Sequence, residues 1–234
     1  MNGIETVLYF AALAAIIFAV WAQIKVSSTF RKYSRVSSRA GLSAAQVARI
    51  ILDGHGLGSV RIERVGGNLT DHYDPRSNTL RLSDGVYDSD SAAAVGVAAH
   101  EAGHAIQHAE NYLPIVIRTK LVPVTSFASR FTWIVIILGS LFMMFDAVFG
   151  YYVFLFGIGL FAVTTLFQLV TLPCEFDASR RALLSLRETK YYSSTELAES
   201  RKVLNAAALT YVAALLVSIL QLLRLIVRVT NRRR

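Results

Sequence analysis

The sequence predicts a mainly α-helical membrane protein with about four transmembrane helices and a small α+β region. Three observations predict this fold class. Of the 234 residues, 54% are hydrophobic, and the mean hydropathy of +0.46 is too high for an ordinary soluble domain. Four apolar runs approach the ~20 residues that a helix needs to cross a bilayer. One long polar stretch, rich in turn residues, separates the first run from the second.

The first apolar run extends from Ile4 to Ile24 and predicts a membrane anchor over residues 1–24. The residues before it, Met1 to Gly3, contain no Lys or Arg. No clear small-residue cleavage site follows the run, so the pattern differs from that of a cleaved signal peptide. We therefore expect the anchor to be retained.

Residues 25–130 form the main polar region. Ser43 and Gln46 have the spacing of a capping box, so a helix should begin there and end near Gly54. Three strand-like pieces follow, at residues 60–65, 69–73 and 79–82. Turn residues separate these pieces, and we expect them to form a small antiparallel sheet.

A segment without helix breakers, Ala92 to Ala109, predicts the next helix. Polar residues at 88–90 would cap its start and give it an acidic first turn. The helix must end before Pro114, because a proline disfavours helical geometry in the residue before it. This helix carries the sequence features that bear on chemistry.

The rest of the chain is predicted to contain three further apolar helices. Residues 131–172 hold two runs joined at Asp146 to Gly150, which predicts a hairpin of two membrane spans. Pro173 should open a separate helix over residues 173–202. The final segment, 203–234, is predicted to form a fourth apolar helix followed by a basic tail.

The net charge of +8 comes from basic residues grouped beside the apolar runs. Such grouping is typical of membrane topology signals, and no recognition motif supports nucleic-acid binding. Residues 25–39 are dense in Lys and Arg, so the polar region of this multi-pass protein is predicted to face the cytoplasm. The arginines after the fourth run contradict this orientation if that run spans. Gln221, Arg224 and Arg228 fall on one helical stripe, so the alternative is that the run's end lies along the membrane surface.

The helix predicted at 92–109 carries His100-Glu101-Ala102-Gly103-His104, an H-E-x-x-H sequence. Residues four apart lie on one face of a helix, so His100 and His104 can hold one zinc ion. Glu101 is then placed to take a proton from the water that the metal activates. The surrounding Ala and Gly residues would let another backbone approach this helix closely.

A catalytic zinc site uses three protein ligands and an open position, so one ligand must come from another segment. Glu175, just after the third apolar run, is the favoured candidate, and Asp177 is the second choice. Two apolar runs separate His104 from Glu175, so both return to the same membrane face if each run spans. The alternative explanation for Glu175 is that acidic residues favour the first turn of any helix.

His108 continues the histidine series but lies eight residues from His100, which is about 12 Å along a straight helix. It should therefore not bind the same ion, and would support the ligands, face the substrate or be exposed. Peptide hydrolysis also calls for a donor that stabilises the oxyanion. The sequence does not choose among the candidates for these supporting roles, which are His108, Asp177, Arg180, Arg181 and Tyr211.

Three segments carry a resemblance to a known family, namely residues 98–108, 172–182 and 209–214. Over almost its whole length the chain resembles the YugP-like neutral zinc metallopeptidase family. It is more distantly similar to HtpX-type membrane proteases and the CAAX prenyl endopeptidase. The resemblance implies a zincin-like region with a gluzincin-type site, whose zinc ligands would be His100, His104 and Glu175. Glu101 would be the catalytic base. The HtpX-type pattern has an Asp where this chain has Ser179, so the contact made by that Asp cannot be carried over.

The sequence therefore predicts a zinc-dependent endopeptidase acting at the cytoplasmic surface of the cell membrane, on membrane-associated proteins or peptides. A metal bound to Glu175 cannot lie far from the bilayer, because that residue directly follows an apolar run. The competing function is a non-catalytic metal-binding scaffold or regulator in the membrane, which would have no need of Glu101. A transporter is disfavoured, since few charged residues interrupt the spans.

Overall fold

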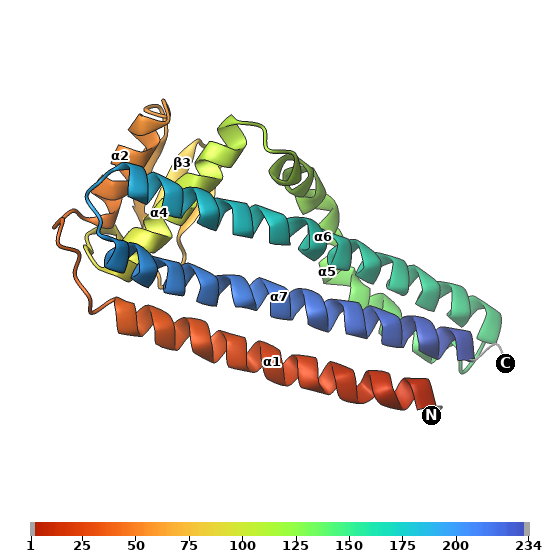
Figure 1. Cartoon of the computed structure of the whole chain (residues 1–234). Coiled ribbons are helices and arrows are strands. Elements are labelled where there is room, and N and C mark those ends of the chain that lie inside the picture. Colours follow the sequence, from red (N-terminus) through yellow and green to blue (C-terminus); the bar gives the residue numbers. More distant parts are fainter. Residues whose placement is uncertain (1–2, 232–234) are drawn as a thin grey trace. The chain divides into compact units, whose positions relative to one another are not determined.

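The computed structural model describes residues 3–231, which form seven helices and three strands (Figure 1). The helices are α1 (Gly3–Tyr33), α2 (Ala44–Gly54), α3 (Asp84–Tyr87), α4 (Ala92–Ala109), α5 (Leu113–Phe142), α6 (Ala147–Glu188) and α7 (Ser194–Asn231). The strands are β1 (Arg61–Val65), β2 (His72–Asp74) and β3 (Thr79–Ser83).

Internal contacts divide the chain into two units. The first unit contains the residues up to Trp21, Ile117–Leu172 and the residues from Tyr211 onward. The second unit contains Ala22–Val116 and Pro173–Thr210. The second unit therefore combines two segments of the sequence, one before and one after the pair of apolar helices within residues 117–172.

Four helices, α1, α5, α6 and α7, are long and apolar enough to cross a membrane. Large apolar side chains point outward along them, and Ile137 on α5 is 63% exposed. Inside a bilayer every backbone N–H and C=O must be satisfied within the protein, which continuous helices achieve. The prediction of a mainly helical chain with four apolar helices is confirmed.

Two predicted helix boundaries are wrong. The second apolar helix, α5, begins at Leu113 rather than near residue 131, and Pro123 lies inside it. Pro173 does not open a separate helix, because α6 runs without interruption from Ala147 to Glu188. A proline removes one backbone donor, but long apolar helices tolerate this loss when neighbouring groups satisfy the freed carbonyl.

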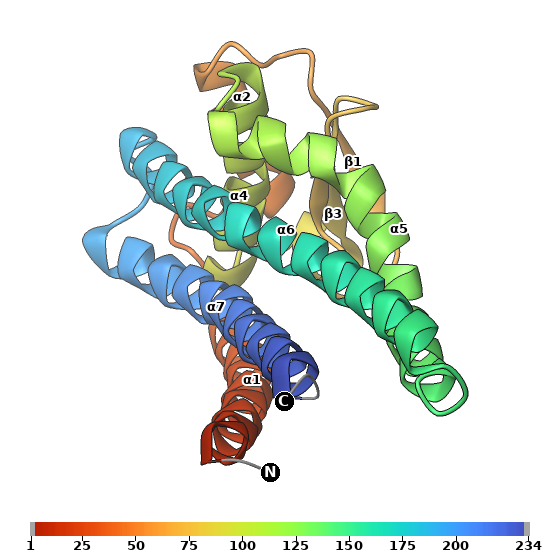
Figure 2. The ribbon, with the colours of Figure 1, turned by 90° about the vertical axis from the view of Figure 1, so that its right-hand side faces the viewer.

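The sheet is mixed, so the prediction of an antiparallel sheet is wrong for one of its two strand pairs. The strand order is β1-β3-β2, with β1 parallel to β3 and β2 antiparallel to β3. Figure 2 shows β1 beside β3. Residues 66–78 connect β1 to β3 and include β2, which provides the dozen or so residues that a parallel connection requires. The turn residues at 66–68 were expected to join two neighbouring antiparallel strands, but the next strand, β2, begins only at His72 and pairs with β3 rather than with β1.

The core of the second unit lies between α2, α4 and the sheet. The capping box at Ser43 is present as predicted, and α2 ends at Gly54. The start of α4 differs from the prediction, because Ser91 rather than residues 88–90 caps it by accepting a hydrogen bond from the Ala94 N–H. Alanines make up much of the buried surface of α4, so neighbouring elements can pack close to its backbone.

Candidate metal centre

Helix α4 presents His100 and His104 on one face, one turn apart. Their ring centroids are 4.8 Å apart and the rings are nearly perpendicular, at 83°. His104 is buried, whereas His100 is partly exposed. The helix therefore offers two imidazole nitrogens to the same point in space.

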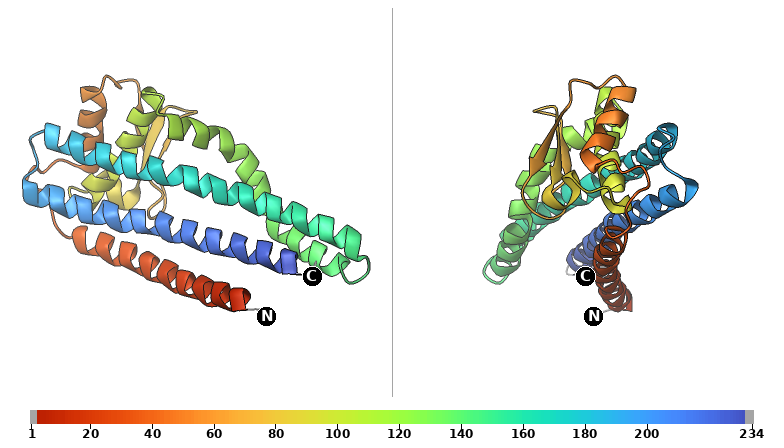
Figure 3. Two further views of the ribbon diagram at one scale, coloured as in Figure 1. Left: turned by 45° about the vertical axis from the view of Figure 1, so that its right-hand side comes forward. Right: turned by 90° about the vertical axis from the view of Figure 1, so that its left-hand side faces the viewer.

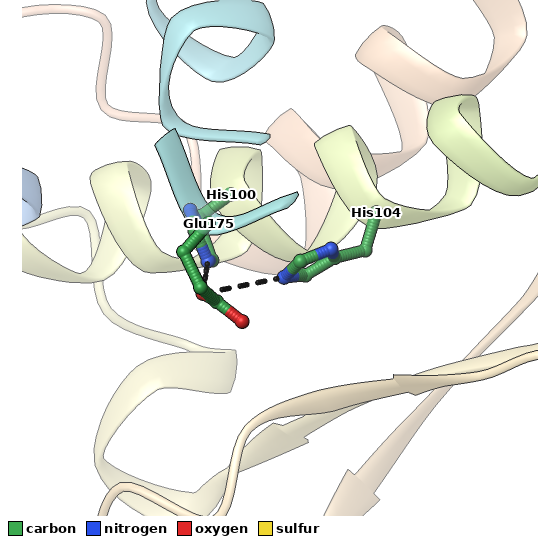
Figure 4. A group of neighbouring side chains, drawn as sticks. All are labelled: His100, His104 and Glu175. Carbon is green, nitrogen blue, oxygen red and sulfur yellow. Dashed lines mark hydrogen bonds and ion pairs between the residues drawn. The ribbon is translucent and has the colours of Figure 1, made fainter. Parts of the chain in front are cut away.

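Glu175 reaches this point from α6 (Figure 4). Its Oε2 atom lies 3.2 Å from Nε2 of His100 and 3.6 Å from Nε2 of His104. The side chain of Glu175 is only 3% exposed. Burial raises the pKa of this carboxyl, which lies past the apolar part of α6. The hydrogen bond with His100 and the neighbouring imidazole of His104 outweigh burial and hold the pKa below its usual range.

Gly103 makes the approach of α6 to α4 possible. A Cβ atom on this glycine would lie 2.6 Å from the backbone oxygen of Ala178 and 3.3 Å from its Cα. Real side chains are not found at such distances from a backbone atom, so any larger residue would push the two helices apart. The glycine inside the H-E-x-x-H sequence thus lets the histidine helix meet the helix of Glu175.

The three side chains fit a zinc ion. Their ligand atoms, two imidazole nitrogens and one carboxylate oxygen, all lie within 4.8 Å of one another. Two histidines and one glutamate form a ligand set found at catalytic zinc sites, where the fourth position stays open. Among the described residues, His100, His104 and Glu175 are thus a group that could hold the ion.

Gln107 orients His104, and sequence reasoning missed it. The Gln107 side chain is fully buried, and its Nε2 donates to the Cys174 carbonyl (2.8 Å) and to Oδ2 of Asp177 (3.0 Å). Both partners can only accept, so Oε1 of Gln107 must face Nδ1 of His104, at 3.0 Å. Nδ1 then carries the proton, and Nε2 is left unprotonated on the side of Glu175. The i, i+3 spacing of these two residues was the available signal, since it places them on one helix face.

Asp177 is not part of the ligand group. Its carboxylate accepts hydrogen bonds from Arg180, Arg181 and Gln107. Arg181 also donates to Glu110, which follows α4. The predicted second choice for a ligand therefore lies in an ionic cluster that connects α6 to the end of α4.

Ser179 contacts the other histidine. Its hydroxyl oxygen lies 3.2 Å from Nδ1 of His100. The resemblance to the HtpX-type pattern left this position without a role, because that pattern has an aspartate where this chain has Ser179. Ser179 therefore supplies a neutral hydroxyl beside His100.

Glu101 is buried beside the ligand group, and one of its oxygens accepts a hydrogen bond from the Tyr73 backbone N–H, at 3.0 Å. Tyr73 lies on β2, so the outer edge of this strand faces the glutamate. The ring of His108 lies 5.6 Å from the ring of Tyr73, and His108 is not among the three residues of the ligand group. Burial raises the pKa of the Tyr73 hydroxyl.

The other predicted supporting residues are divided between the two units. Arg180 and Arg181 lie in the second unit and bind Asp177, and the side chain of Arg180 is 65% exposed. Tyr211 lies on α7 in the first unit and is exposed. Cys174, next to Glu175, is buried, and its carbonyl accepts a hydrogen bond from Gln107.

Comparisons with known proteins agree with a zinc-binding site in this chain. A family model described as "Putative neutral zinc metallopeptidase" matches residues 8–230. A relative from Bacillus subtilis (strain 168), named "Putative membrane protease YugP", is 45% identical over 224 residues, which cover 96% of this chain and 97% of the relative. No solved structure matches.

The name of the relative and the four apolar helices support a membrane protein, and both comparisons support a protease. The predicted zinc cofactor agrees with the family description and with the group of His100, His104 and Glu175. Both the family model and the relative match nearly the whole chain, so they identify its family. The chain belongs to the neutral zinc metallopeptidase family.

Proposed function

We propose that the chain is a gluzincin-type zinc endopeptidase with a zincin-like catalytic region, and that it hydrolyses peptide bonds at the membrane surface. The observation that carries this proposal is the convergence of His100, His104 and Glu175 beside the buried carboxylate of Glu101. A scaffold that only binds metal would have no need of that fourth group. The second candidate function, a non-catalytic scaffold, therefore has no observation in its favour.

In this proposal zinc, held by two imidazoles and one carboxylate, supplies a Lewis acid that activates water and polarises the scissile carbonyl. Glu101 is the general base, which takes a proton from the attacking water and passes it to the leaving amine. The N–H of Tyr73 fixes one oxygen of this carboxylate. Gln107 and Ser179 hold the two imidazoles through their Nδ1 atoms.

The edge of β2 is the proposed place for an extended substrate. The strand β3 is central and is paired on both sides, so it offers no free edge for this role. Among the described strands β2 pairs only with β3, and its outer edge faces Glu101. Backbone groups at a strand edge can bind a peptide in extended form, which would bring its carbonyl beside the metal ligands.

Membrane-associated substrates follow from the position of Glu175 in the sequence. This residue lies three positions after Leu172, which ends the apolar part of α6, and is about 5 Å farther along the helix axis. A membrane-anchored chain is held near such a site at high effective concentration. The Lys and Arg residues at 25–39 support a cytoplasmic location for the site.

The test compares the wild-type protein with Glu101→Gln in proteoliposomes, using an unfolded casein-like substrate and a membrane-anchored peptide. Glutamine keeps the shape of the side chain but cannot take the proton, so cleavage should fall by roughly 100-fold or more while zinc content stays unchanged. Glu63→Gln, on β1, is the matched control and should retain full activity. Cleavage by Glu101→Gln at the wild-type rate would contradict the proposed mechanism.

A further inference from the structure

The polar stripe near the end of α7 has no part in the proposed reaction. Gln221, Arg224 and Arg228 share one face of this helix, which continues without a break to Asn231. The adjacent face of the same turns carries Leu225 and Val229, which are buried against apolar residues of α5 and α6. The end of α7 is thus packed among the helices of the first unit, and its arginines are held beside apolar neighbours.

A polar face of α1 meets this stripe. Oε1 of Glu5 accepts a hydrogen bond from Nδ2 of Asn231, at 2.8 Å. The guanidinium group of Arg224 lies 5.2 Å from the centre of the Tyr9 ring and donates to Oε1 of Gln221, at 3.1 Å. The first residues of α1 and the last residues of α7 lie at the same end of the first unit (Figure 3).

A cavity of about 290 Å³ opens between these two faces. It is lined by Glu5, Leu8, Tyr9, Gln221, Arg224, Leu225, Val227 and Arg228. This volume corresponds to several water molecules, at about 30 Å³ each, and is large enough for a small polar group. Its lining carries two positive charges and one negative charge, so the cavity has an excess of positive charge.

The two arginines form no salt bridge with the carboxylates of residues 3–231. Charged side chains within apolar helices usually pair with an opposite charge or face a polar cavity. Arg224 is held in place by Tyr9 and Gln221, which are neutral and leave its charge uncompensated. An anion in the cavity would supply the missing negative charge.

We propose that this cavity binds the phosphodiester group of a membrane phospholipid. Arginine forms paired hydrogen bonds with phosphate oxygens, and Arg224 and Arg228 lie one helical turn apart on the same face. A phospholipid is favoured over a soluble phosphate because Leu8, Leu225 and Val227 also line the cavity and suit the apolar glycerol and acyl portion. The cavity also lies near the ends of two helices that can cross a bilayer, where headgroups are found.

The experiment measures lipid binding to the full-length protein by native mass spectrometry, with phosphatidylglycerol as the probe. The wild-type protein should retain one phosphatidylglycerol per chain. Arg224→Gln/Arg228→Gln should bind it roughly tenfold more weakly or worse, because two charged hydrogen-bond donors are lost. Lys25→Gln/Arg31→Gln is the matched control, since it removes the same charge from a part of α1 that does not line the cavity, and its affinity should be unchanged.

A Lys pair at positions 224 and 228 keeps the charge but loses the paired geometry, so Arg224→Lys/Arg228→Lys should bind with intermediate affinity. This variant also serves if the double Gln variant does not fold by circular dichroism. Glycerol phosphate should not displace the lipid, and displacement at a comparable concentration would overturn the lipid assignment in favour of a soluble phosphate. Equal affinity for phosphatidylglycerol in the wild-type and double Gln proteins would overturn the proposal itself, and zinc content should be the same in all variants.

Discussion

The metal centre of the second unit and the arginine-lined cavity of the first unit differ in how far their polar side chains have partners within the protein. At the metal centre, the amide group of Gln107 uses both of its N–H donors and its oxygen in hydrogen bonds. Each of these three bonds has only one possible donor and one possible acceptor. In the cavity, Arg224 and Arg228 have no salt bridge among residues 3–231. A saturated network fixes the positions of its members, whereas an unsaturated cluster leaves binding capacity for a further group.

The largest effect should follow from separating the two helices of the metal centre. In Gly103→Ala the new methyl group would collide with the Ala178 backbone, so Glu175 should move away from the histidines. We expect zinc affinity to fall by upward of roughly 100-fold, measured by titration against a chromogenic chelator. Gly54→Ala is the control, because a Cβ atom there would meet no atom within 4 Å, and zinc affinity should not change. An unchanged affinity in Gly103→Ala would mean that the close contact does not position Glu175.

A smaller effect should follow from removing the side chain that orients His104. Gln107→Leu preserves the approximate volume but loses all three hydrogen bonds, so zinc should bind roughly 10- to 100-fold more weakly. The visible absorption of a cobalt-substituted sample should also change, because the imidazole would no longer be held in one orientation. Ser179→Ala removes one contact to His100 and should cost less than about tenfold. If the serine variant were weaker than the glutamine variant, the ranking of the two supporting contacts would be reversed.

The smallest effect is expected in the first unit and should have the opposite sign. Arg228→Leu removes a charge that has no carboxylate partner among the described residues and replaces it with an apolar side chain. In detergent without phospholipid, the variant should be as stable as the wild type or more stable, by up to about 1 kcal/mol. Phosphatidylglycerol should then stabilise the wild-type protein more than the variant in thermal unfolding. A large loss of stability without lipid would indicate that Arg228 already has an essential partner within the protein.

The features that could be predicted from the sequence are those that depend on the spacing of residues close together in the chain. His100 and His104 could be paired because four residues make one helical turn, and the Ser43 capping box follows from a three-residue spacing in the same way. The third ligand depended on topology, since Glu175 lies 71 positions after His104 and its candidacy required two intervening spans. The structure brings these residues together, and Asp177 does not join them.

The errors arose where neighbours far away in the sequence decide the structure. The mixed sheet arises because β3 lies between β1 and β2. The turn residues between the strands do not indicate this strand order. Pro173 was predicted to begin a helix, because proline is common in the first turn of helices. In the structure the preceding apolar helix continues through that position. The role of Gln107 could not be predicted in full from the sequence near it, because its partners Cys174 and Asp177 lie on α6.

The central claim is that His100, His104 and Glu175 hold one catalytic zinc ion, and metal analysis of purified protein by mass spectrometry tests it most directly. We expect about one zinc per chain in the wild-type protein, because the three ligand atoms converge. His104→Ala and Glu175→Ala should lose nearly all of the metal, whereas Asp177→Ala should retain most of it. Full zinc occupancy in a variant that lacks both His100 and His104 would contradict the account, as would a greater loss in Asp177→Ala than in Glu175→Ala.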